Sequence, residues 1–177
     1  TYLESLGIYD VWGLARVVKS EHNQINLDVS DTQELEDILN KGGFDVVINC
    51  IGLLNKTAEE NPDMAIWFNS YFPHLLSNLG NKYCFKLIHI STDCVFSGSE
   101  GGYKEESFKN GIGFYAQSKA LGEVVNRKDL TFRTSIIGPE LKHSGIGLFH
   151  WFMIQKNDVF GFSEAYWSGV TTIELAK

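Results

Sequence analysis

The chain has 177 residues, of which 44% are hydrophobic and 21% charged, and it carries a formal net charge of -7 at pH 7. This size and composition are typical of one globular domain that buries a sizeable core. Because the chain is acidic, has no basic block and contains no long apolar run, we expect neither nucleic acid nor a membrane among its partners.

The three cysteines are Cys50, Cys84 and Cys94, and their spacing matches neither a metal site nor a disulfide framework. Cys50 and Cys84 stand in or beside apolar runs, so we expect both thiols in the core. The sequence shows no secretory-signal pattern. These features favour a reducing, cytoplasmic compartment.

The first half of the chain alternates between expected strands and helices. Residues 1–7 resemble the last turns of a helix. Ser30, with Gln33 three residues later, is a capping-box pattern that predicts a helix ending at the pair Gly42 and Gly43. The expected strands in this half are residues 9–15, 24–29 and 45–50. The third is apolar almost throughout, which predicts a strand with both faces covered.

In the second half, Asn61 and Pro62 predict the N-cap and first turn of a helix that kinks at Pro73 and ends near Gly80. The elements expected after it are a strand at 86–91, a loop at 97–113, a helix at 115–125 and a strand at 130–137. Strands that alternate with helices predict the α/β class, with a doubly wound, Rossmann-like parallel sheet. We expect a nucleotide-binding domain over 1–140 and the start of a substrate-binding region over 141–177.

In a Rossmann-like sheet, the first strand and its glycine-rich turn precede a helix such as residues 1–7. Neither feature stands in the sequence, and residues 173–177 look like the start of another helix. We therefore expect an internal part of a longer protein that lacks its first strand and most of its C-terminal substrate region. Expressed alone, such a chain should be poorly soluble and should show no measurable nicotinamide binding.

Two short segments carry the clearest chemical signal. Ser91 and Thr92 stand at the carboxyl end of the expected strand 86–91, and Tyr115 and Lys119 stand four residues apart on the next helix. Side chains at this spacing share a helix face, where the Lys119 ammonium would lower the pKa of the phenol. With a strand-end hydroxyl to polarise a carbonyl, this combination favours hydride transfer between a nicotinamide and a sugar or alcohol carbon. Taken alone, the Tyr/Lys spacing also fits the edge of an amphipathic helix.

Arg16 follows the expected strand 9–15, at the place where Rossmann-like sheets meet the adenosine ribose. An acidic residue there binds the ribose hydroxyls and favours NAD(H), whereas an Arg accepts the extra phosphate of NADP(H). Arg16 therefore favours NADP(H) over NAD(H). The alternative is an exposed Arg at a strand end.

With these residues placed, the chain resembles the extended short-chain dehydrogenase/reductases, and within them the dTDP-4-dehydrorhamnose reductase branch. The segments that carry the resemblance are 90–98 and 114–123, with weaker support from 45–52, Asn69 and 132–135. The resemblance implies an NAD(P)H-dependent reductase of a nucleotide-linked keto-sugar, acting in deoxysugar or surface-polysaccharide synthesis. It is also compatible with a homodimer.

The resemblance implies a role for each matched residue. Tyr115 is the acid that protonates the carbonyl oxygen, and Lys119 binds the nicotinamide ribose. Thr92 holds the substrate oxygen, with Ser91 as support. The further cofactor-binding residues are Asp28 and Val29 beside the adenine, Cys50, Ile51 and Gly52 beneath the cofactor, and Asn69 as a brace from its helix. The alternatives are local roles: Asp28 as a strand end, Gly52 as a turn and Asn69 as a helix residue bonded to its neighbours.

The sequence departs from the family pattern at several points. Ala116 stands where the family commonly has Gly, and Cys94 where the reductase branch often has Tyr. Related dehydratases have an Asp–Glu pair after the Thr, but only Asp93 is present here, so elimination of water loses support. The missing glycine-rich turn removes the N–H groups that would hold a pyrophosphate. Two other functions stay open: a non-catalytic binding or regulatory subunit of the same fold, and a nucleotide-sugar epimerase.

Overall fold

The structure is a computed structural model that describes residues 2–18, 23–140, 145 and 147–177. The chain forms two compact units. The larger unit comprises Leu14–Lys19 and Ile25–Arg133, and the smaller unit comprises Thr1–Gly13, Ser20–Gln24 and Thr134–Lys177. The larger unit thus ends at Arg133, whereas the sequence suggests a boundary at residue 140. All predicted site residues lie in the larger unit.

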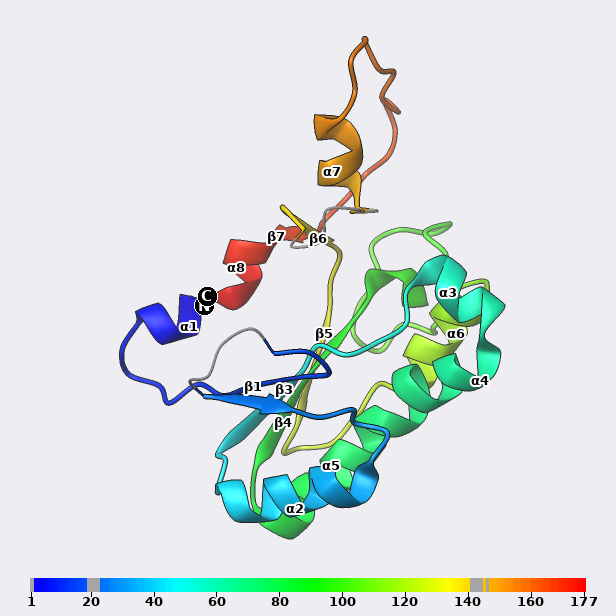
Figure 1. The fold of residues 1–177 in the computed structure, drawn as a ribbon. Helices are drawn as coiled ribbons and strands as arrows, with labels where there is room; N and C mark the ends of the chain where they lie inside the picture. Colours follow the sequence, from blue (N-terminus) through cyan, green and yellow to red (C-terminus); the bar gives the residue numbers. More distant parts are fainter. Residues whose placement is uncertain (1, 19–22, 141–144, 146) are drawn as a thin grey trace. The chain divides into compact units, whose positions relative to one another are not determined.

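Helices and strands alternate along the first 133 residues, as predicted for the α/β class (Figure 1). The strands are β1 (Gly13–Ala15), β2 (Gln24–Asn26), β3 (Val46–Asn49), β4 (Lys86–Ser91) and β5 (Leu130–Arg133). The helices are α2 (Thr32–Gly42), α3 (Asn55–Glu60), α4 (Pro62–Ala65), the π-helix η1 (Ile66–Tyr71), α5 (Phe72–Tyr83), the short 3₁₀ turn η2 (Asp93–Val95) and α6 (Phe114–Leu121). Strands β3, β4 and β5 form a parallel sheet in that order, and β1 pairs with β2 in a separate sheet.

Strand β3 is an edge strand, and only one of its faces is covered. Val47 packs against the core, whereas Val46 and Ile48 on the other face are 45% and 46% exposed. The prediction that both faces of this strand are covered is therefore wrong. Successive side chains of a strand point to opposite faces, which explains why Val47 is covered while Val46 and Ile48 are not. Strand β3 is called an edge strand because, among the described residues, it pairs only with β4.

The core lies between the sheet and the neighbouring helices α2 and α5 (Figure 1). Its fully buried members include Phe72, Phe85 and Leu87. Helix α2 begins at an N-cap that differs from the predicted Ser30: the Asp31 carboxylate accepts the Glu34 N–H at 3.0 Å. The predicted end of this helix is confirmed, because Gly43 takes the left-handed conformation with φ 59°.

The helix that begins at Pro62 is interrupted earlier than predicted. The π-helix η1 covers Ile66–Tyr71, and the Phe72 N–H donates to the carbonyl of Trp67, five residues back. Pro73 has no N–H, so the Asn69 carbonyl lacks its usual helical donor and the preceding turn widens. Helix α5 then continues past Gly80 to Tyr83 and ends at Cys84, whose φ is 64°.

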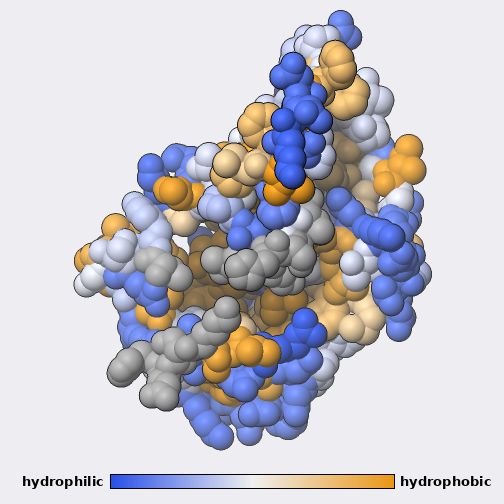
Figure 2. Space-filling model, turned by 45° about the horizontal axis from the view of Figure 1, so that its top comes forward, coloured by the Kyte–Doolittle hydropathy of each residue, from blue (hydrophilic) through white to orange (hydrophobic). Residues whose placement is uncertain are grey.

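The smaller unit contains short elements. They are α1 (Tyr2–Ser5), β6 (Ile136–Ile137), α7 (Leu148–Met153), β7 (Val170–Thr171) and α8 (Thr172–Ala176). Helices α1 and α8 were expected, but α7 and the parallel β6–β7 pair were not, and the predicted strand 130–137 is broken after Arg133. Large apolar side chains such as Phe160 and Phe162 are exposed. Figure 2 shows hydrophobic residues at the surface among hydrophilic ones. No helix of the described residues is long and apolar enough to cross a membrane.

Candidate active site

The carboxyl end of β4 and helix α6 bring together the residues of the two predicted motifs. Thr92 directly follows β4, and its hydroxyl accepts the Cys94 N–H at 3.1 Å, which caps the turn η2. The Thr92 hydroxyl lies near the Tyr115 phenol and favours its ionised form, an effect that by itself lowers the pKa of that phenol. Two segments that are distant in the sequence therefore place two hydroxyl groups at one point, as the sequence predicts.

The electrostatics of Tyr115 differ from the prediction. Burial raises the pKa of the phenol above its ordinary value, and the nearby Thr92 hydroxyl only partly offsets this effect. The predicted lowering of this pKa by Lys119 is not present, because the Lys119 amine donates to the carbonyl of Ile90 at 2.8 Å. Tyr115 is therefore protonated at neutral pH and can donate a proton.

Lys119 is almost fully buried, with 5% of its surface exposed. Burial lowers the pKa of its amine from 10.5 to about 8, although the nearby Glu123 carboxylate acts in the opposite direction. The amine therefore changes charge close to physiological pH. Its bond to Ile90 uses one of the three hydrogens of the ammonium, so the group can still bind a ligand.

Asn69 braces the site from the π-helix η1. Its amide accepts the N–H of Leu53 at 2.8 Å, donates to the carbonyl of Leu53 at 3.0 Å and donates to the Ser118 hydroxyl at 3.1 Å. The side chain is 0% exposed, so it holds the Gly52–Leu53 loop against α6 and presents no group to a cofactor directly. A Cβ at Gly52 would come within 3.0 Å of the Asn69 Oδ1 and 3.7 Å of the Lys119 Nζ, which explains a glycine there.

Helix α6 is held at three further points. The Glu59 carboxylate of α3 accepts the Tyr115 N–H at 3.0 Å, and the Ser70 hydroxyl donates to the Ser118 carbonyl at 2.8 Å. Gly122 packs directly on the Asn69 carbonyl, since a Cβ there would lie 1.7 Å from that oxygen. The widened turn of η1 and the absence of a side chain at Gly122 thus allow the close approach that positions Tyr115 and Lys119.

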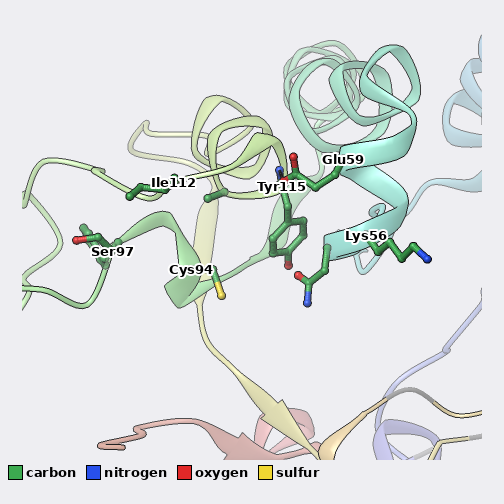
Figure 3. Close-up of a pocket in the computed structure, with 9 residues that line it drawn as sticks. Lys56, Glu59, Cys94, Ser97, Ile112 and Tyr115 are labelled. Carbon is green, nitrogen blue, oxygen red and sulfur yellow. Dashed lines mark hydrogen bonds between the residues drawn. The ribbon is translucent and has the colours of Figure 1, made fainter.

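Tyr115 lines a pocket of about 420 Å³. Figure 3 shows its ring between Cys94 on one side and Lys56 and Glu59 of α3 on the other. The remaining lining residues are Asn55, Phe96, Ser97, Ile112 and Ala116. Cys94, which stands where the reductase branch often has Tyr, lies in the site. The predicted burial of Cys50 and Cys84 is wrong, because both are exposed, one beyond the end of β3 and the other at the end of α5.

The predicted adenosine-binding residues lie beyond the ends of β1 and β2. Arg16 is exposed, and its charge lowers the pKa of Asp28, although the larger causes are the hydrogen bonds from the Ser30 N–H and hydroxyl. Asp28 thus closes a local turn through one carboxylate oxygen, beyond the end of β2. The side chain of Val29 is buried in the core, so only its backbone can reach a ligand.

The sequence analysis missed the partners of Glu123. This carboxylate is 1% exposed and accepts two hydrogen bonds from Arg133, both at 2.8 Å, one from Lys109 at 3.0 Å and one from Ser91 at 3.1 Å. Ser91 therefore points at Glu123 and supports Thr92 from behind. The available signal was the spacing of Glu123 four residues after Lys119, which continues the face of Tyr115 and Lys119.

Asn49 and His89 support the loop that follows β3. The Asn49 amide lies 3.2 Å from the His89 Nδ1, and its oxygen accepts the Ile51 N–H at 3.0 Å. Burial lowers the pKa of His89 to about 3, so its ring is neutral and is no acid or base at neutral pH. The pair therefore orders Cys50, Ile51 and Gly52, which have no side chain capable of acid–base catalysis at neutral pH.

The residues present fit a nicotinamide cofactor. A glycine loop lies beside a buried amine, and a protonated phenol lines a pocket. Among the described residues, no group of three or more His, Cys, Asp or Glu side chains is placed to hold a metal ion. A parallel α/β sheet with a Thr–Tyr–Lys group at its carboxyl end defines a short-chain dehydrogenase/reductase-like protein.

The chain belongs to the family described as the RmlD substrate binding domain, which it matches over residues 11–144. The probable low-salt glycan biosynthesis reductase Agl14 of Haloferax volcanii is 32% identical over 117 residues, which make up 63% of this chain and 39% of that protein.

Two solved structures agree with this assignment. A hypothetical dTDP-4-dehydrorhamnose reductase from Sulfolobus tokodaii has a TM-score of 0.69 at 30% identity, over 78% of this chain and 52% of that chain. The dTDP-4-dehydrorhamnose reductase of Bacillus anthracis in complex with NADP has a TM-score of 0.59 at 25% identity, over 64% and 44% of the two chains. The chain spans about half the length, or less, of these relatives.

Proposed function

We propose that the protein is an NAD(P)H-dependent reductase of a nucleotide-linked keto-sugar in deoxysugar or surface-polysaccharide synthesis. The observation that carries the proposal is the Tyr115 phenol at a pocket, with the Thr92 hydroxyl near it and the buried Lys119 amine on the same helix as Tyr115. The names of the relatives, a glycan biosynthesis reductase and dTDP-4-dehydrorhamnose reductases, support the same substrate class.

In this proposal Tyr115 donates the proton to the carbonyl oxygen of the sugar. Its raised pKa keeps the phenol protonated at neutral pH, which suits the direction of reduction. Thr92 lies near the phenol and holds the same oxygen, while Ser91 fixes the strand end. A reduced nicotinamide, when bound, supplies the hydride.

Lys119 would bind the nicotinamide ribose beside Gly52, and the loop 50–52 would run beneath the cofactor. Arg16 is exposed beyond β1 and would accept the extra phosphate of NADP(H), so we propose a preference for NADPH. The NADP complex of the Bacillus anthracis relative supports this choice. Asp28 would contact the adenosine with the carboxylate oxygen that Ser30 leaves free.

Net consumption of NADPH separates this proposal from its alternatives. The protein would be mixed with NADPH and dTDP-4-dehydrorhamnose, and NADPH absorbance and sugar products would be followed together. We expect one NADPH oxidised for each sugar reduced. An altered sugar without NADPH loss would indicate an epimerase, and no reaction by a folded protein would indicate a non-catalytic subunit; either result would contradict the proposal.

We also propose that the protein is a homodimer and acts in the cytoplasm. Tyr71, Leu121 and Val125 have large side chains that are 52%, 69% and 85% exposed. Tyr71 ends η1, Leu121 ends α6 and Val125 lies four residues beyond it. Helices η1 and α6 are neighbours, and His74 of α5 bonds to the carbonyl of Leu121. Light scattering of the protein and of a Leu121→Lys variant tests the dimer, and a monomeric unmodified protein would contradict it. Three free thiols suit a reducing compartment.

A further inference from the structure

The segment from Phe96 to Ile112 forms one wall of the pocket but contains no helix or strand. Its ends are tied to each other, because the Gly111 N–H donates to the Val95 carbonyl at 2.8 Å and the Ser97 N–H donates to the Asn110 side chain at 2.8 Å. These two bonds close the segment into a loop. They do not hold the loop against the rest of the unit.

Arg133, at the end of β5, holds this loop at two places. One guanidinium nitrogen donates to the carbonyl of Glu105 at 2.9 Å. The guanidinium also lies over the Phe96 ring, 5.1 Å from its centre, and Phe96 stacks on Tyr103 with ring centres 4.4 Å apart. Such cation–ring and ring–ring contacts are attractive because the ring face is electron-rich and its edge is electron-poor.

Glu123 fixes the guanidinium in this orientation. Its two oxygens accept two parallel bonds from Arg133, an arrangement that sets the plane of the guanidinium as well as its position. Lys109 is a second arm from the loop, since its amine donates to Glu123 at 3.0 Å and to the Ala120 carbonyl at 3.1 Å. Two cations outweigh the cost of burial, so the pKa of Glu123 lies below its ordinary value.

The same carboxylate reaches the reacting groups. The Ser91 hydroxyl donates to Glu123 at 3.1 Å, and Ser91 directly precedes Thr92. One buried ion pair therefore connects the strand end that carries Thr92 with the loop whose Ser97 and Ile112 line the pocket. A buried ion pair contributes little net stability compared with apolar side chains of the same volume. The Glu123–Arg133 pair is therefore better explained by what it connects, the strand end at Ser91 and the 96–112 loop, than by a gain in stability.

We propose that the Glu123–Arg133 ion pair is a positioning element that holds the 96–112 loop as the pocket wall and thereby sets the affinity for the sugar substrate. This effect on affinity rests on the proposed function, whereas the effect on the loop does not. Loss of the pair should loosen the loop and raise the substrate KM more than it lowers kcat. NADPH binding should change little in Arg133→Lys, because this variant keeps the Glu123 charge that acts on Lys119 and Arg133 does not belong to the cofactor loop 50–52.

The test uses two variants. Glu123→Gln keeps the shape of the side chain and removes its charge, and Arg133→Lys keeps the positive charge and removes the pair of parallel hydrogen bonds that the guanidinium makes. Asp129→Asn is the matched control, because Asp129 is also a buried paired carboxylate but accepts the Leu87 N–H at the start of β4. Hydrogen exchange of the 96–112 amides, NADPH affinity and the steady-state constants would be measured for each. Arg133→Lys still decides the matter if Glu123→Gln does not fold.

We expect Glu123→Gln and Arg133→Lys to speed hydrogen exchange of the 96–112 amides by about 10- to 100-fold, because each variant loses charged hydrogen bonds. Both variants should also raise the substrate KM by at least about tenfold. NADPH affinity of Arg133→Lys should stay within about twofold. Unchanged exchange in 96–112, or equal changes in Asp129→Asn, would overturn the proposal. Hydrogen exchange tests whether the Glu123–Arg133 pair holds the 96–112 loop, and this measurement needs no sugar reduction. The NADPH assay tests the proposed function, so the two claims can fail independently.

Discussion

Two buried carboxylates lie at opposite ends of the parallel sheet, and their partners differ. Asp129 stands just before β5, where the strands begin, and it pairs with Lys128 and accepts bonds from its surroundings: the Leu87 N–H, the Ser77 hydroxyl and the Asn126 amide. Glu123 lies at the end where the strands finish, and its partners are Arg133, Lys109 and Ser91.

The different partners of Asp129 and Glu123 indicate that one end of the sheet stabilises the fold while the other supports the pocket. The partners of Asp129 join α5, β4 and β5 and do not line the pocket, so this network closes the scaffold. The partners of Glu123 hold or belong to the 96–112 loop, or precede Thr92. Open α/β sheets bind ligands beyond the carboxyl ends of their strands, so the polar groups at that end support binding while those at the other end support the fold.

The largest loss of stability should follow Asp129→Ala. The substitution leaves the half-buried Lys128 amine, the Leu87 N–H, the Ser77 hydroxyl and the Asn126 amide without their carboxylate, which should cost about 3–5 kcal/mol of unfolding free energy. Urea denaturation measures this loss. The folded fraction should keep the substrate KM of the unmodified protein, and a changed KM would break the separation between the two ends of the sheet.

Gly122→Ala should affect both stability and turnover. The added Cβ would press on the Asn69 carbonyl and displace α6, at about 1–3 kcal/mol. A shift of about 1 Å in Tyr115 would lower turnover by roughly 10²-fold. Gly161→Ala is the matched control, because a Cβ there meets nothing within 4 Å. Equal behaviour of the two variants would show that the close approach of Gly122 has no role.

The pH dependence of stability should report the buried Lys119. Its pKa in the folded protein is about 8, below the ordinary value of 10.5 for a lysine. Between these pH values the unfolded chain binds the proton and the folded protein does not, so stability rises with pH, by up to about 1.4 kcal/mol per pH unit. Below pH 8 both states are protonated and this contribution is flat. In Lys119→Met the rise should vanish; a rise of the same size would show that Lys119 is not its source.

Arg16→Ala should have the smallest effect, because this side chain is exposed. We expect NADPH affinity to fall by about tenfold, as for one charged hydrogen bond, while NADH affinity stays unchanged. Titration of cofactor fluorescence measures both. Equal affinities for NADPH and NADH in the unmodified protein would contradict the proposed preference.

The sequence predicted the parts of the site that depend on local pattern. Strand β4 has the predicted bounds, and Tyr115 and Lys119 lie on one helix at the end of that strand. The parts that depend on distant contacts were missed. The Asn69 carbonyl of the π-helix packs on Gly122, a contact between residues 53 positions apart. Glu123 is recognised as the centre of an ion-pair network only when Arg133 and Lys109 are placed against it. Single-residue patterns also misplaced the α2 cap by one position, because Ser30 and Asp31 both suit an N-cap.

The central claim is that Tyr115 donates the proton at the carboxyl end of the sheet. Single-turnover oxidation of bound NADPH by the keto-sugar, compared between the unmodified protein and Tyr115→Phe, tests it most directly. Tyr83→Phe is the control, since that phenol bonds to Glu36 away from the pocket. The account predicts a rate lower by about 10²–10⁴-fold in Tyr115→Phe, with NADPH affinity and folding retained. A near-normal rate in that variant would contradict it.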